Sequence, residues 1–149
     1  MVFNLRRVPT VYLVLVLCLN LVACDGSGNS QAVSMSDNDI AIISSQAASF
    51  RLAEDRLPEL AELVANRNWV FTRNLIHGPL QEVGREMLYI NQHLLPEDRD
   101  QASKIAEGLK SALSELDEAA KLQDGDRLTR AYGKVVDGFV NYGKVIPVQ

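Results

Sequence analysis

The stretch "NLIHGPLQEVGREM", Asn74 to Met87, places a Gly-Pro pair inside a pattern that is otherwise helical. Apolar residues recur through it and just beyond it in steps of four and three, which is the spacing of one helix face. These residues are Ile76, Leu80, Val83, Met87, Ile90 and Leu94. Pro79 has no N–H group, so the carbonyl of Leu75 loses its helical partner. We therefore predict that His77, Gly78 and Pro79 form a structural kink in a long amphipathic helix.

A second helical pattern precedes this stretch and begins near Asp37. Its apolar face comprises Ile43, Ala47, Phe50, Leu57, Ala61 and Val64. Ser36 and Asp39 resemble a helix-start signal, because a serine hydroxyl caps the N–H group three residues later. Pro58 lies inside the pattern and predicts a kink or a short break. The helix that carries the opening stretch is expected to begin at an Asn68 cap.

Two more helical patterns follow the opening stretch. Pro96 marks the expected end of the preceding helix, and Asp98 with Gln101 resembles a capping box for the next one. That third helix is expected to end at Gly125, and the fourth at Pro147. Four amphipathic helices joined by short loops predict an all-α, antiparallel up-down four-helix bundle.

The N-terminal segment has the features of a secretory signal. Arg6 and Arg7 precede a short apolar run, which ends in "LVAC", Leu21 to Cys24. This ending resembles the bacterial lipobox, which implies cleavage before Cys24 and lipid attachment to its sulfur. An ordinary signal peptide with an unrelated cysteine is the alternative. The expected organisation is a signal peptide over 1–23, a lipidated flexible tether over 24–36 and the bundle over 37–149.

Charge and cysteine content exclude several classes of function. The chain has 149 residues and a formal net charge of −4. Removing Arg6 and Arg7 with the signal leaves 13 basic and 19 acidic residues, which is a net charge of −6. Such a charge disfavours nucleic acid as a partner. Cys18 and Cys24 form no CxxC motif, so the strong zinc, redox and haem-attachment signals are absent.

The two histidines do not form a recognisable catalytic or metal site. His77 and His93 lie about 24 Å apart along an ideal helix, too far to share an ion. The sequence has no Glu-x-x-His pair of the di-iron bundles, no catalytic triad pattern and no phosphate-binding loop. We expect His77 to satisfy a freed carbonyl or to contact a facing helix. A partner contact and metal binding are the alternatives.

Two segments carry a resemblance to a known family. The segment "NWVFTRNLIHGPLQEVGREML", Asn68 to Leu88, and the segment "LLPEDRDQA", Leu94 to Ala102, resemble the cyanobacterial PsbQ-like lipoproteins, the CyanoQ family. The Trp spacing, the "IHGPL" core, the "REML" motif and the "LLP" stop carry the likeness, and the lipobox agrees with it. The resemblance covers Cys24 to Gln149 and is weaker in the first and last helices.

The resemblance implies a non-catalytic extrinsic subunit of photosystem II. Its place would be the lumenal side of the thylakoid membrane, held by a lipid anchor on Cys24. Its expected partners are PsbO and the lumenal loops of the core antenna, and its role would be to stabilise the oxygen-evolving side. The family carries no obligatory cofactor, although calcium ion binding and palmitate are associated with it. The runner-up is a free-standing bacterial lipoprotein that binds a small ligand or a metal.

Arg67, Trp69 and Arg73 gather where the second predicted helix begins. Arginine and tryptophan dominate the energetics of protein interfaces, and arginine binds carboxylates in a bidentate manner. We predict that these three residues contribute to the contact with the photosystem. The alternative is that Trp69 plugs the end of the core while the arginines only solvate the helix.

Overall fold

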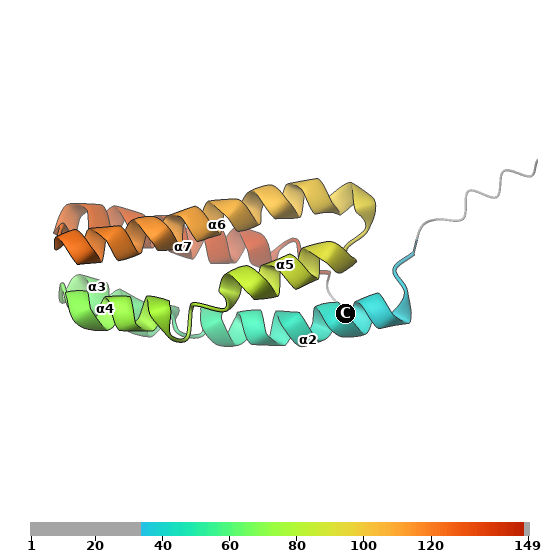
Figure 1. Cartoon of the computed structure of the whole chain (residues 1–149), viewed down its shortest axis with the longest axis horizontal. Helices are drawn as coiled ribbons and strands as arrows, with labels where there is room; N and C mark the ends of the chain where they lie inside the picture. The colour runs from blue at the N-terminus through green and yellow to red at the C-terminus, as the bar shows by residue number, and fades with distance from the viewer. Residues whose placement is uncertain (1–33, 148–149) are drawn as a thin grey trace, which may run out of the picture. The chain divides into compact units, whose positions relative to one another are not determined.

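The computed structural model describes residues 34–147, which form six helices and no strand. The helices are α2 (Asp37–Glu54), α3 (Leu57–Ala65), α4 (Trp69–His77), α5 (Val83–His93), α6 (Pro96–Leu122) and α7 (Gly125–Gly143). We call each of the four long segments of the bundle an arm. α2 and α3 together form the first arm, and α4 and α5 run back as the second (Figure 1). With the unbroken α6 and α7, they form the predicted all-α, up-down four-helix bundle.

The break in the first arm is the one that Pro58 predicts. A residue at position 58 would normally donate its N–H to the carbonyl of Glu54, and proline cannot. α2 therefore ends at Glu54, and the Arg56 N–H donates to the Ala53 carbonyl at 3.1 Å instead. α3 starts at Leu57 with Pro58 in its first turn, where a missing N–H is tolerated.

The break in the second arm is larger than the predicted kink. α4 ends at His77 and α5 begins only at Val83. The Leu75 carbonyl, which Pro79 leaves without its helical donor, accepts the Leu80 N–H at 3.1 Å. Gly78 is required for a local reason, since a Cβ added there would lie 2.8 Å from the Asn74 carbonyl oxygen. The chain thus makes a widened turn, after which α5 resumes the direction of α4 (Figure 1).

Three of the predicted helix boundaries were wrong. α6 begins at Pro96, ahead of the expected capping box, because proline is well placed in a first helical turn. α6 ends at Leu122 rather than Gly125, and the residue in the left-handed conformation is Gln123, with φ of 57°. Gly125 instead opens α7, where the Asp124 side chain accepts the Arg127 N–H at 3.0 Å. The fourth helix ends at Gly143, before the expected stop at Pro147.

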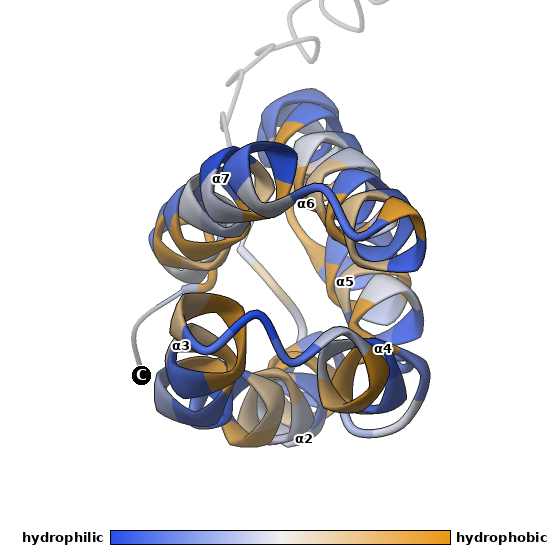
Figure 2. Cartoon of the chain, turned by 90° about the vertical axis from the view of Figure 1, so that its left-hand side faces the viewer, coloured by the Kyte–Doolittle hydropathy of each residue, from blue (hydrophilic) through white to orange (hydrophobic). Residues whose placement is uncertain are grey.

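The core lies between the four arms, and Figure 2 shows the hydrophobic residues turned toward it. Its largest fully buried side chains include Phe50 from α2 and Phe139 and Tyr142 from α7. The ring of Phe50 lies 5.1 Å from each of the other two, measured between centroids. The Tyr142 hydroxyl donates into the second arm, 2.9 Å from the Met87 carbonyl and 2.7 Å from Asn91 Oδ1. This aromatic group joins three of the arms.

α6 and α7 pack closely at Gly138. A Cβ added to this residue would lie 2.8 Å from Leu109 Cδ1 and 3.2 Å from Leu109 Cα. Because Gly138 has no side chain, Leu109 of α6 packs directly against the backbone of α7. Gly108, Gly133 and Gly143 have no such neighbour within 4 Å, so their positions in helices are not explained by close packing.

Candidate functional site

The predicted partner-binding residues lie at one end of the bundle, around the connection from α3 to α4. This connection lies beside the one from α6 to α7, and both face the viewer in Figure 2. Arg67 has φ of 50°, a left-handed conformation that is costly for a residue other than glycine. It is held by a helix-ending motif in which Arg67 N donates to the Val64 carbonyl and Asn68 N to the Leu63 carbonyl.

The side chain of Arg67 is exposed and reaches the start of α7. A Cβ added to Gly125 would lie 2.9 Å from Arg67 Nε, so the guanidinium lies directly over this glycine. Asn68 acts as the predicted cap of α4, since its side chain accepts the Phe71 N–H at 3.3 Å. The connection therefore fixes both the backbone and the position of the arginine.

Two apolar side chains are exposed next to this arginine. Val70 is 66% exposed and Phe71 is 59% exposed, both in the first turn of α4. Trp69 is half-buried and packs against the core. The end of the bundle thus presents a cation beside apolar surface, a composition suited to a protein partner.

Arg73 belongs to a clasp between α4 and α6, by which we mean a group of charged side chains that joins two helices by hydrogen bonds. Arg73 Nε and His77 Nε2 both donate to Asp117 Oδ1, at 3.0 Å and 2.8 Å. Burial acts to raise the pKa of the Asp117 carboxyl, but the hydrogen bonds from Arg73 and His77 outweigh it and hold the pKa below its usual value. His77 therefore contacts a facing helix, as one of the sequence-based alternatives expected. Arg73 is only partly available to a partner, because it is committed to this clasp.

The second histidine forms a similar clasp between α5 and α2. His93 Nδ1 lies 2.6 Å from Asp39 Oδ1, and Ser36 Oγ donates to the same carboxyl at 2.5 Å. These hydrogen bonds, with that from Ser36 the stronger, lower the pKa of Asp39. Ser36 also caps α2 as predicted, accepting the Asp39 N–H at 3.1 Å. Each histidine thus pairs with one aspartate of another helix.

Other predicted features concern metal, membrane and lipid. Within residues 34–147, no group of three or more His, Cys, Asp or Glu side chains is arranged to hold a metal ion. Nor does any helix among the described residues have the length and apolar character to cross a membrane. Cys24, the expected lipidation site, and the signal peptide over 1–23 lie outside the described residues.

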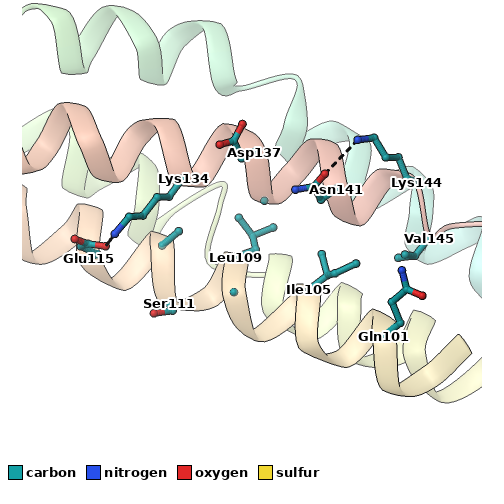
Figure 3. A pocket seen from close by; sticks show the side chains of 13 residues that line it. Gln101, Ile105, Leu109, Ser111, Glu115, Lys134, Asp137, Asn141, Lys144 and Val145 are labelled. Carbon is teal, nitrogen blue, oxygen red and sulfur yellow. Dashed lines mark hydrogen bonds and ion pairs between the residues drawn. The ribbon is translucent and has the colours of Figure 1, made fainter.

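An elongated groove of about 680 Å³ runs between α6 and α7 (Figure 3). Its apolar floor includes Ile105, Leu109 and Ala112, and open space lies above Gly108. Lys134 crosses one end and donates to Glu115 at 2.6 Å. The inner faces of both helices are buried. Sequence reasoning missed the outer groove, although Gly108 was a visible signal for it.

Comparisons with known proteins give a consistent result. The family described as PsbQ, oxygen evolving enhancer protein 3, matches residues 6–147. Among curated proteins, CyanoQ of Synechocystis sp. is 32% identical over 145 residues, which cover 97% of this chain and 97% of the relative. The match therefore spans both the N-terminal segment and the bundle.

Proposed function

The chain belongs to the PsbQ family, oxygen evolving enhancer protein 3, and from this premise we propose that it is a non-catalytic extrinsic subunit of photosystem II. Its place is the lumenal side of the thylakoid membrane, where it stabilises the oxygen-evolving side and the assembled complex. The observation that carries the proposal is the family match over residues 6–147. The ion pairs between helices support a structural role. Asp117 and Asp39 bind Arg73 and His93 of other helices, and a catalytic site would need such side chains free.

The first test asks whether the chain is part of the complex. Oxygen-evolving complexes are purified through a tag on this chain, and their subunits are identified by mass spectrometry. We expect PsbO and the core antenna subunits to co-purify with it. Complexes purified through a tagged core subunit should contain the chain in turn. Its absence from active complexes that retain PsbO would overturn the proposal.

We assign part of the docking contact to the end of the bundle that carries Arg67, Trp69 and Arg73. Arg67 and Phe71, four residues apart, offer a cation and an exposed apolar ring at this end, and Arg73 adds charge that is already shared with Asp117. Charge reversal at Arg73 would also break its clasp, so Arg67 is the better probe. The expected partners are carboxylate-bearing lumenal loops of the core antenna and PsbO.

The docking test combines Arg67→Glu with Phe71→Ala. We expect the affinity for the complex to fall by about 1–3 kcal/mol, as for typical interface residues. The matched control is Arg51→Glu with Leu52→Ala, which makes the same charge reversal and a comparable loss of an apolar side chain at exposed positions of α2. Association is followed by co-purification across a salt series. Equal retention of the two variants would place the docking surface elsewhere.

Membrane attachment through Cys24 is the remaining part of the proposal. Acyl chains contribute about 0.8 kcal/mol per buried CH₂, and more than one chain holds a protein firmly on a bilayer. Cys24→Ser should therefore release the chain from the membrane fraction, whereas Cys18→Ser should not. Mass spectrometry of the N-terminal peptide identifies the acyl group. A Cys24→Ser chain that resists salt washing, with unprocessed precursor excluded, would refute the anchor.

A further inference from the structure

One end of the groove between α6 and α7 carries a cluster of basic side chains. The chain as a whole carries a net charge of −4. At one end of the groove, however, Lys134 forms an ion pair with Glu115, and Arg127 and Arg130 also act on this single carboxylate. Three cations thus act on one acidic group, and the pKa of Glu115 is lowered chiefly by its hydrogen bond from Lys134.

The two arginines retain capacity for a further anion. Among the described residues, neither guanidinium is engaged in a hydrogen bond or ion pair, and Arg130 is exposed. Arg127, Arg130 and Lys134 recur at helical spacing on α7, so they continue the rim on which Asp137 and Lys144 lie. The groove itself is lined by two cations, Lys134 and Lys144, and two acids, Glu115 and Asp137, so Arg127 and Arg130 add their positive charge beyond its end.

The middle of the groove is apolar and open. Leu109 and Ala112 are buried at its floor, and Ile105 is half-buried beside them (Figure 3). A Cβ added to Gly108 would have no neighbour within 4 Å, so space lies directly above this position. A helical segment buries its apolar stripe in a groove of this kind through side chains at i, i+3 and i+4.

From these features we propose that the α6–α7 groove binds an acidic, amphipathic peptide segment of a protein partner. Apolar side chains of the segment pack over Ile105, Leu109 and Ala112, and its carboxylates pair with Arg127 and Arg130. A peptide suits this surface better than an anionic membrane, since a planar bilayer cannot follow a narrow groove between two helices. The proposal does not depend on the photosystem assignment, because it rests on charge and shape alone.

The test measures the fluorescence anisotropy of a fluorescein-labelled synthetic peptide, with leucines at helical spacing and glutamates between them. The full chain is reconstituted in nanodiscs of neutral lipid, and empty nanodiscs give the background. We expect saturable binding that weakens with salt, and no binding of the peptide in which lysines replace the glutamates. Equal binding of both peptides, or no binding of either, would overturn the proposal.

Two sets of variants locate the site. Gly108→Leu fills the groove and should weaken binding at least about tenfold, whereas Gly133→Leu, the same change at an exposed α7 position outside the groove, should leave it unchanged. Arg127→Gln with Arg130→Gln should also weaken binding about tenfold, while Arg56→Gln with Arg85→Gln removes the same charge elsewhere without effect. Circular dichroism melting verifies that each variant folds.

The outcomes separate a groove from a general electrostatic attraction. Selective loss in Gly108→Leu and in the arginine pair supports a groove that binds peptide. Equal affinities of Gly108→Leu and Gly133→Leu would refute it. Binding of anionic vesicles through Arg127 and Arg130, with no peptide bound, would identify a membrane contact and would likewise refute it.

Discussion

At the scale of single residues, the polar side chains that matter most are those that join helices. Asp117 is the centre of one clasp, because two donors from α4 converge on one of its oxygens. Glu86 is the opposite case. It is only 8% exposed, and its Oε2 atom has no hydrogen-bond partner among the described residues. The first arrangement stabilises the fold and the second costs free energy.

The clasp at Asp117 makes stability depend on pH. The pKa of this carboxyl is lower in the folded chain than the value near 3.9 of an unfolded one, so its contribution is complete above the unfolded pKa. It is lost as the pH falls through the lower, folded pKa. We expect Asp117→Asn to reduce the free energy of unfolding by about 1–2 kcal/mol at neutral pH and to flatten its decline in acid. Urea titrations at several pH values measure both effects.

A control for this prediction lies on the same helix. Asp100 is exposed and pairs with no side chain in the described part of the chain. Asp100→Asn should leave both the stability at neutral pH and its acid dependence close to those of the wild type. If both variants follow the same curve, the clasp contributes nothing to folding.

Glu86 offers a stabilising substitution. Glu86→Met keeps a side chain of similar length and removes the buried, unpartnered oxygen. We expect the free energy of unfolding to rise by about 1 kcal/mol, the usual cost of a buried polar group without a partner. The exposed Glu97 provides the control substitution, Glu97→Met, which should change little. Thermal melting that shows a lower Tm for Glu86→Met would contradict this account.

At the scale of the helices, two helices end with the same backbone motif. α3 and α6 both end with the pair of backbone hydrogen bonds that closes a left-handed turn. Glycine usually occupies the left-handed position, but here the residues are Arg67 and Gln123. Each pays a conformational cost that a glycine would avoid. The arginine at position 67 supplies a cation at the proposed docking end in spite of this cost. No comparable role is evident for the side chain of Gln123.

The ending of α6 therefore gives a prediction with a clear sign. Gln123→Gly should raise the free energy of unfolding by about 1 kcal/mol, because glycine adopts positive φ without steric strain. Gln123→Ala also removes the side chain but retains the Cβ, so it should not raise stability. Urea denaturation compares the three chains. A gain in Gln123→Ala equal to that in Gln123→Gly would show that the backbone strain is not the cause.

At the scale of the whole bundle, Tyr142 connects arms that are distant in sequence. Its ring packs on Phe50 of α2, and its hydroxyl donates to α5 from α7. Burial raises the pKa of the phenol, so the hydroxyl keeps its proton across the ordinary pH range. Asn91, which receives this hydrogen bond, reaches Ser103 of α6 at 3.4 Å. One hydrogen-bonded network, buried at Tyr142 and Asn91, thus spans the second, third and fourth arms.

Removing one hydroxyl tests this network. Tyr142→Phe preserves the ring but removes the one hydroxyl proton that the Met87 carbonyl and Asn91 Oδ1 share. We expect the free energy of unfolding to fall by about 1–3 kcal/mol, the cost of unpaired buried polar groups. Tyr89→Phe, at an exposed position of α5, is the control and should have little effect. Equal melting temperatures for the two variants would show that the network is not stabilising.

The amino-acid sequence by itself determined the helices and the places where they break. Pro58 and the Gly78-Pro79 pair act on donors and carbonyls within a few residues of themselves, so their effect is readable locally. The caps at Ser36 and Asn68 are local for the same reason. Gly125 misled the prediction because a glycine also suits a helix start, and only the backbone conformation distinguishes the two.

Only the tertiary structure decided which faces meet and which stay open. The Asp117 partner of His77 lies 40 residues away, and the Asp39 partner of His93 lies 54 residues away. The exposure of Phe71 and the outer groove at Gly108 likewise follow from how the helices are rotated and spaced against one another. Periodicity gives each helix an apolar face, but the rotation and register between helices come from the packing of all four arms at once, which no local pattern encodes.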